Sequence, residues 1–314
     1  MAINMTRRSF LAGATATAAV AAGTAKAMMA PTVDDNLSVF LSDLHVRDPQ
    51  CHQYRYFAAI VDEILSLNPR PKHVVVFGDI AYTCGLKPEY ETSRPLFRKL
   101  IDAGMDITFG MGNHDRRAAF LSVWPGYKNR ILLPGKIVSR ADLGSVDLLM
   151  LDGLQGTDDR ADDDMGPVDG KLDKAQEDWL YAYLKGLKKP TILASHYPLA
   201  DMRGTEKRSF ADHFRDYPLL CGYIYGHLHR WDPYWTKHGW GMSKLLRNVC
   251  LPSTGHWGDI GYVLFRAEAH KGTATFVQKD FFFSEPAKDG EMRPQEWDDI
   301  LSDRSRDLVC TFRW

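Results

Sequence analysis

The sequence predicts an α/β protein built around a parallel β-sheet, and two features of the chain support this prediction. Between residues 37 and 115, short apolar segments alternate with longer segments whose apolar residues recur at helical spacing. The short segments are rich in β-branched and aromatic residues and run directly into polar or glycine-containing turns. Strands that alternate with helices in this order form parallel sheets. The composition excludes a disordered, collagen-like or coiled-coil chain, because 45% of the residues are hydrophobic and 25% are charged.

Each element follows from its local pattern. Strands are predicted at residues 37–42, 74–77, 107–110, 191–194 and 223–225. Helices are predicted at residues 56–65, 90–103 and 173–187, where apolar side chains share one face. Three short apolar runs between 131 and 152, and the segment 240–283, are strand-like, and the tail is predicted to carry a short helix around Trp297 and Ile300. Since no repeat or linker interrupts the chain, residues 28–314 are predicted to form one domain.

The first 27 residues have the three regions of an export signal. Arg7 and Arg8 form a charged region, residues 11–23 are small and apolar, and Ala25-Lys26-Ala27 offers a cleavage site. The surrounding string, Thr-Arg-Arg-Ser-Phe-Leu, resembles twin-arginine (Tat) signals. This resemblance implies export by the Tat translocase, cleavage after residue 27 and a periplasmic or extracellular mature protein without a membrane anchor.

Charge and cysteine usage exclude several function classes. Removal of residues 1–27 leaves 36 basic and 40 acidic residues, a net charge of −4. Nucleic-acid binders carry a basic surplus, so no stable nucleic-acid partner is expected. The five cysteines lack C-x-x-C spacing, which excludes a zinc ribbon and a dense disulfide framework.

Five motifs place metal-capable side chains directly after predicted strands. They are Asp43-Leu44-His45, Gly78-Asp79, Gly112-Asn113-His114-Asp115, Ser195-His196 and Gly226-His227-Leu228-His229. The carboxyl ends of parallel strands line one crevice, so these distant motifs are expected to meet there. Carboxylates, an amide and imidazoles suit metals such as Fe, Mn and Zn. The sequence therefore predicts a metal centre at this edge of the sheet.

This ordered set resembles the calcineurin-like metallophosphoesterase superfamily, whose motif series D-x-H, G-D, G-N-H-D, H and G-H-x-H is complete here. The resemblance implies a four-layer α/β/β/α sandwich of two mixed β-sheets. It also implies two metal ions of unknown identity (Fe, Mn or Zn), and hydrolysis by direct attack of a metal-bound hydroxide on a phosphoester.

The resemblance assigns a role to each motif residue. The metal ligands are expected to be Asp43, His45, Asp79, Asn113, His196, His227 and His229, with Asp79 bridging the two ions. His114 is expected to protonate the leaving oxygen or bind the phosphoryl group, oriented by Asp115. The Gly-Asp-x-x-Tyr string is similar to the iron-ligating motif of purple acid phosphatases, but His45 is expected to fill that position. Tyr82 is therefore favoured as a packing or supporting residue over a direct ligand.

Residues beside the motifs are candidates for substrate contact. Arginine suits bidentate phosphate binding, which makes Arg116, Arg117 and Arg230 candidates. His256 lies in a loop expected near the same rim. For each of these residues an ordinary surface or packing role is the alternative.

These observations predict an exported phosphoesterase that acts on phosphate mono- or diesters of small molecules. A cyclic-nucleotide phosphodiesterase and a nuclease of the same superfamily are the alternatives, and the charge of −4 argues against the nuclease. A metal-binding scaffold without activity would be expected to have lost ligands or His114, and neither is lost.

Overall fold

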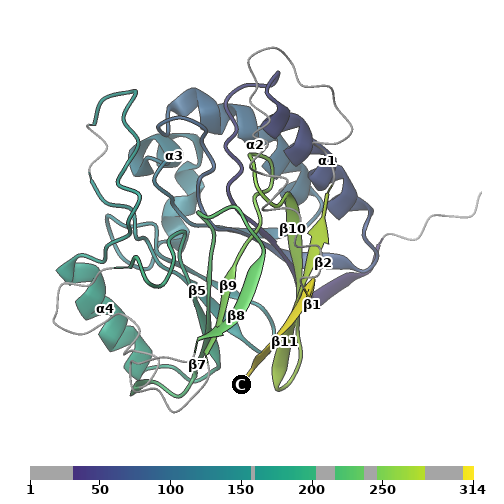
Figure 1. Ribbon diagram of the computed structural model, residues 1–314, viewed down its shortest axis with the longest axis vertical. Helices are drawn as coiled ribbons and strands as arrows, with labels where there is room; N and C mark the ends of the chain where they lie inside the picture. The colour runs from purple at the N-terminus through teal and green to yellow at the C-terminus, as the bar shows by residue number, and fades with distance from the viewer. Residues whose placement is uncertain (1–30, 157–159, 203–215, 237–245, 280–306) are drawn as a thin grey trace, which may run out of the picture. The chain divides into compact units, whose positions relative to one another are not determined.

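Two six-stranded mixed sheets form the centre of the protein (Figure 1). The computed structural model describes residues 31–156, 160–202, 216–236, 246–279 and 307–314, which belong to one compact unit beginning at Pro31. Sheet 1 contains, in spatial order, β12 (Val309–Arg313), β11 (Lys271–Gln278), β10 (Gly261–Ala267), β1 (Val33–Leu41), β2 (Arg70–Val76) and β3 (Asp106–Phe109). Sheet 2 contains β4 (Ser139–Asp142), β5 (Asp147–Met150), β6 (Thr191–Ala194), β7 (Leu220–Tyr225), β9 (Leu246–Cys250) and β8 (Asp232–Thr236).

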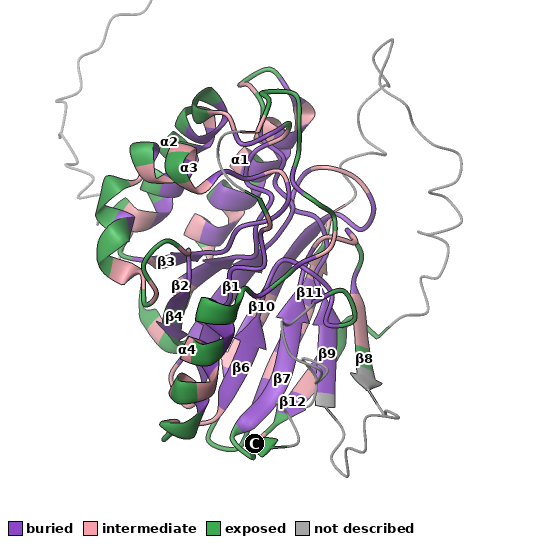
Figure 2. Cartoon of the chain, turned by 90° about the vertical axis from the view of Figure 1, so that its left-hand side faces the viewer, coloured by how far each residue is buried: buried purple, intermediate pink, exposed green. Residues whose placement is uncertain are grey.

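Helices cover the outer face of each sheet, which gives four layers. Sheet 1 carries α1 (His52–Ser66), α2 (Lys87–Asp102) and α3 (Arg117–Val123), followed by the 3₁₀ helix η1 (Pro125–Arg130), and sheet 2 carries α4 (Lys174–Lys185). Alternation along β1 shows the layering, because Val39 and Leu41 pack against the helices while Phe40 packs between the sheets. Figure 2 shows buried strands between helices whose outer sides are exposed.

The helices begin where side chains satisfy their free backbone N–H groups. The Cys51 side chain accepts from Tyr54 N at the start of α1, and Asp173 accepts from Gln176 N at the start of α4. At α2 the Glu89 carboxylate accepts from Leu86 N at 2.8 Å. None of the helices in the described part of the chain is both long and apolar enough to cross a bilayer.

The elements agree with the sequence-based prediction in type and differ in number. Every predicted strand and helix within the described residues is present, and residues 131–152 hold two strands, β4 and β5, rather than three. The sequence did not indicate α3, η1, β8 or β12. Helix α3 has only seven residues and no side-chain cap, so its pattern is too short to be recognised. Residues 1–27, Trp297 and Ile300 lie outside the described residues.

Parallel pairing brings several strand ends to one edge. Strands β1, β2 and β3 run parallel in sheet 1, and β5, β6, β7 and β9 run parallel in sheet 2. The five motifs follow β1, β2, β3, β6 and β7. Both sheets therefore contribute residues to one site.

Candidate metal centre

Backbone hydrogen bonds continue past the strand ends and hold the motif loops together. After β1 and β2, Asp43 N donates to Gly78 O at 3.2 Å and His45 N donates to Asp79 O at 3.0 Å. In sheet 2, Gly226 N donates to His196 O at 3.0 Å. These backbone hydrogen bonds alone fix neighbouring motifs relative to one another.

One group of three side chains gathers around Asp43. His229 Nε2 lies 3.2 Å from Asp43 Oδ1, and His45 Nε2 lies 3.3 Å from His229 Nε2. The ligand atoms of these three residues all lie within 4.8 Å of one another, and all three residues are buried. Two imidazole nitrogens and a carboxylate oxygen converging in this way match the donor set of a transition-metal site.

A second group gathers around Asp79. His196 Nε2 lies 3.2 Å from Asp79 Oδ2 and 3.0 Å from His227 Nδ1. Asp79 Oδ2 also lies 3.6 Å from His45 Nε2, so Asp79 faces both groups. Asn113 Oδ1 is buried without a hydrogen-bond partner among the described residues. Six of the seven predicted ligands thus lie in two adjacent groups, and Asn113, the seventh, is buried with an unpartnered amide oxygen.

The electrostatics of the centre favour a cation. Burial alone would lower the pKa of His196, yet the charge of Asp79 raises it to about 9. Burial holds the pKa of His227 at about 4 and that of His45 well below its usual range, which leaves neutral imidazoles. Buried carboxylates, neutral imidazoles and an unpartnered amide oxygen fit bound metal ions.

The backbone is strained at the same residues. Within the described residues, the non-glycine positions with positive φ are Asp43 at 51°, His45 at 48°, Asp79 at 48°, His227 at 70° and His229 at 52°. This conformation costs an L-residue about 1–2 kcal/mol, and such strain concentrates at functional sites. All five are predicted ligands, so the strain independently marks this centre.

Glycines give the loops room to approach each other. A Cβ on Gly112 would overlap Asp79 Oδ1, and a Cβ on Gly226 would overlap Ser42 Oγ. The glycines of the G-N-H-D and G-H-x-H motifs are thus required by close packing around Asp79 and Asp43.

His114 borders the centre, but Asp115 does not orient it. The His114 ring lies 4.6 Å from that of His45, and its Nδ1 lies 2.6 Å from Tyr82 O and 2.8 Å from Thr83 O. Those two backbone carbonyls, rather than a carboxylate, hold the ring.

Asp115 has a different role from the one predicted. Its carboxylate accepts from the N–H groups of Ile80, Ala81 and Gly112 and from the Tyr90 hydroxyl at 3.0 Å. The predicted pairing of Asp115 with His114 is wrong, because the buried N–H groups of two motif loops use that carboxylate instead.

Two arginines predicted for substrate contact bind other groups of the protein itself. Arg116 is buried, and its Nε donates to Cys84 O at 2.6 Å. Arg117 forms a bidentate pair with the buried Asp152, at 2.7 and 2.8 Å. Through these contacts both guanidinium groups hold loops in place rather than contacting substrate.

Sequence reasoning missed Arg160, whose Nη2 donates to Asp115 O at 2.6 Å. No pattern in the sequence around Arg160 signals this contact.

The other candidates lie at the rim. The ring of Tyr82 lies 6.4 Å from that of His45. The Arg47 guanidinium lies over the Tyr82 ring, 5.2 Å from its centre. The exposed Arg230 pairs with Asp232 at 3.2 Å. The ring of His256 lies 4.2 Å from that of His45, and burial lowers the pKa of His256 to about 3. The supporting role of Tyr82 stays a prediction, as do the substrate contacts of Arg230 and His256.

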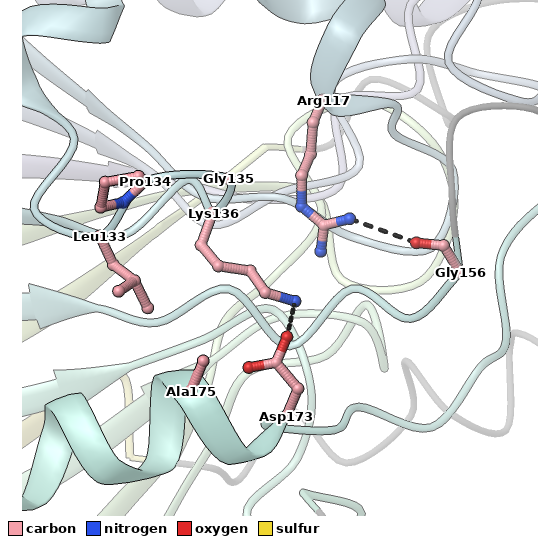
Figure 3. A pocket seen from close by; sticks show the side chains of 8 residues that line it. All are labelled: Arg117, Leu133, Pro134, Gly135, Lys136, Gly156, Asp173 and Ala175. Atoms are coloured by element: carbon pink, nitrogen blue, oxygen red, sulfur yellow. Dashed lines mark hydrogen bonds and ion pairs between the residues drawn. The ribbon is translucent and has the colours of Figure 1, made fainter.

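A separate cavity of about 510 Å³ lies beside Arg117 (Figure 3). Its charged groups have partners within the wall, since Lys136 Nζ lies 2.7 Å from Asp173 Oδ2 and Arg117 Nη1 donates to Gly156 O. None of the predicted metal ligands lines this cavity. It is therefore distinct from the metal centre.

Comparison with known proteins establishes the fold. No protein-family model matches the sequence, and no curated protein matches it. The structure is similar to that of a dimetal phosphatase from Danio rerio, with 12% identity over 76% of this chain and 95% of that chain and a TM-score of 0.56. It also matches PhoD, with 16% identity over 76% of this chain and 65% of that chain and a TM-score of 0.47. Vps29 from Chaetomium thermophilum matches with 14% identity over 78% of this chain and 92% of that chain, at a TM-score of 0.36. The similarity to the dimetal phosphatase confirms the predicted fold of two mixed β-sheets between layers of helices.

The strain at the ligands predicts opposite effects of one substitution at two histidines. In metal-free protein, His227→Asn is expected to raise the free energy of unfolding by up to about 1 kcal/mol, because asparagine adopts positive φ more readily. His196→Asn serves as the control, since His196 has ordinary φ and its Nδ1 lies 3.0 Å from Phe77 O. It is expected to lower stability by about 1–3 kcal/mol by leaving a buried carbonyl unpaired. Urea unfolding in a chelator measures both, and equal losses would contradict strain at His227.

Proposed function

We propose that this protein is an exported binuclear metal phosphoesterase that hydrolyses phosphate mono- or diesters of small molecules. The observation that carries the proposal is the position of Asp79, which faces both groups of candidate ligands, 3.6 Å from His45 Nε2 and 3.2 Å from His196 Nε2. A carboxylate placed in this way can bridge two ions. Two such ions would supply an activated water and neutralise charge on the phosphoryl group.

The chain's own groups hold this arrangement. His114 N donates to Asp79 Oδ1 at 2.9 Å, and His227 N donates to both oxygens of Asp43 at 3.1 Å. His114 Nδ1 donates to backbone carbonyls, which leaves Nε2 as the ring atom that can deliver a proton to the leaving oxygen. His114 is thus the general acid of the proposal.

An acidic loop beside the centre favours a small substrate over a polyanion. Gly166 N donates to Asn113 O at 2.7 Å, which docks the loop after Arg160 against the G-N-H-D motif. Asp162, Asp163 and Asp164 lie exposed in this loop. Their charges would repel nucleic acid, so a nuclease is the less favoured alternative.

Export is the second part of the proposal. Arg7, Arg8 and the cleavage pattern at residues 25–27 support it, and the compact unit begins at Pro31, beyond that pattern. Removal of the signal would therefore leave the compact unit intact.

The bridging role predicts that Asp79→Asn lowers metal content and abolishes hydrolysis, because one carboxylate serves both groups. Elemental analysis and assays with aryl mono- and diesters, with and without chelator, measure the two effects. Asp62→Asn is the matched control, since Asp62 is exposed on α1 and pairs with Lys99. Two tightly retained ions in inactive Asp79→Asn would reject the bridge, and wild-type activity that persists after unfolding and refolding in chelator, with no metal found by elemental analysis, would reject the metal enzyme.

The general-acid role predicts that His114→Ala retains metal and loses about 10²–10⁴-fold in kcat. The loss is expected to be smaller for nitrophenyl esters than for alkyl esters, because nitrophenolate leaves without protonation. A leaving-group series measured against His270→Ala, an exposed control, tests this. An equal loss across the series would reject His114 as the acid.

The export signal predicts that exchanging both Arg7 and Arg8 for lysine leaves uncleaved precursor in the cytoplasm. Cell fractionation with an immunoblot against the mature protein measures the cleaved and uncleaved forms, with Lys26→Arg as the control. Normal processing of the double variant would show that the Tat route does not carry this protein.

A further inference from the structure

The loop that carries His256 is tied at two points to the ligand group around Asp43. Ser253 Oγ donates to Asp43 O at 2.8 Å and accepts from His256 N at 2.8 Å. Asp259 N donates to His229 O at 2.9 Å on the far side of the loop. His256 therefore has a fixed backbone position relative to the centre, with its ring 5.5 Å from that of His229 and 5.4 Å from that of Tyr82.

Helix α1 contributes a buried amide to this ring. Gln53 Nε2 lies 3.1 Å from His256 Nδ1. An amide nitrogen can only donate, so His256 Nδ1 accepts, and the proton of the neutral ring is on Nε2. No described residue hydrogen-bonds to Nε2, and the side chain is not fully buried. Nε2–H is thus the donor that His256 offers to a substrate.

His114 is held in the opposite tautomer. Its Nδ1 faces the carbonyl oxygens of Tyr82 and Thr83, which can only accept, so Nδ1 carries a proton. Nε2 of the neutral ring then has a lone pair. The rings of His114 and His256 lie 4.6 and 4.2 Å from that of His45. Nε2 of neutral His114 is an acceptor that can take up a proton, whereas Nε2 of neutral His256 is a donor.

We propose that Gln53 is a positioning residue that fixes His256 as a neutral Nε2–H donor to a non-bridging phosphoryl oxygen of the substrate. This inference rests on the proposed phosphoesterase function and adds a residue pair to it. Negative charge grows on the phosphoryl group in the transition state, and an oriented donor stabilises that charge without reorganisation. His114 would deliver a proton to the leaving oxygen from Nε2 of its imidazolium form, so the two histidines act on different oxygens.

The first arm of the test observes the tautomers directly. Long-range ¹H–¹⁵N correlation spectra of zinc-loaded protein, recorded at a pH where both rings are neutral, are expected to show His256 with its proton on Nε2 and His114 with its proton on Nδ1, assigned with His256→Gln and His114→Ala. A proton on Nδ1 of His256 would overturn the proposal. This arm needs no activity, so it stands apart from any failure of the proposed function.

The second arm reverses the tautomer with little change of shape. Gln53→Glu replaces the donor by an acceptor, which draws the His256 proton to Nδ1 and removes the donor at Nε2. We expect kcat to fall about 10²-fold with KM and metal content nearly unchanged. Gln50→Leu is the control, since Gln50 is exposed just before the same helix.

Packing of His256 against His45 is the competing explanation, and the same variants distinguish it. If His256 only packs, Gln53→Glu keeps wild-type kcat because the ring and its hydrogen bond are retained, and the proposal is wrong. His256→Gln is expected to recover part of the kcat that His256→Ala loses, because glutamine also has an N–H donor. Equal losses in the two variants would overturn the donor role. A wild-type protein without phosphoesterase activity would instead reject the proposed function.

Discussion

The whole centre depends on a hydrogen bond that joins the two sheets. His227 N, after β7 of sheet 2, donates to the carboxylate of Asp43, after β1 of sheet 1, at 3.1 Å. His196 Nδ1 makes a second connection, 3.0 Å from Phe77 O. Because the connected segments lie at the carboxyl ends of parallel strands, any shift of one sheet against the other would separate both ligand groups. The packing between the sheets is therefore also the means by which the ligands are positioned.

The sequence predicted the part of this arrangement that local pattern encodes. Apolar strands followed directly by Asp43, Asp79 or His227 showed where the chain turns at the sheet edge, and parallel connections implied that these turns meet. The partners of Asp115 and Arg116 could not be read in the same way. Asp115 binds Tyr90 on α2, and Arg116 binds Cys84 O, contacts set by tertiary packing with no local signal.

Charged residues beside the predicted ligand motifs form hydrogen bonds with the backbone of this protein. Asp115 and Arg160 add side-chain hydrogen bonds to the backbone bonds of the motif loops, and Arg117 donates to Leu154 O in a neighbouring loop. An arginine next to a ligand therefore needs its hydrogen-bond partners examined before it is assigned to phosphate. Gln53 is the opposite case. It is an uncharged residue of α1 outside every motif, yet it contacts His256 at the edge of the centre.

The depth of the ligands has a consequence for metal exchange. Asp43 and His196 are 0% exposed and Asp79 is 2% exposed, while His114 and His227 are half-buried at the open side. An ion held by these side chains could leave only when several of them move together, so exchange with the surroundings would be limited by local opening rather than by affinity. The bound metals would then be those that were available in the compartment where the chain folded. For a chain that folds before it is exported, the bound metals would be those available in the cytoplasm.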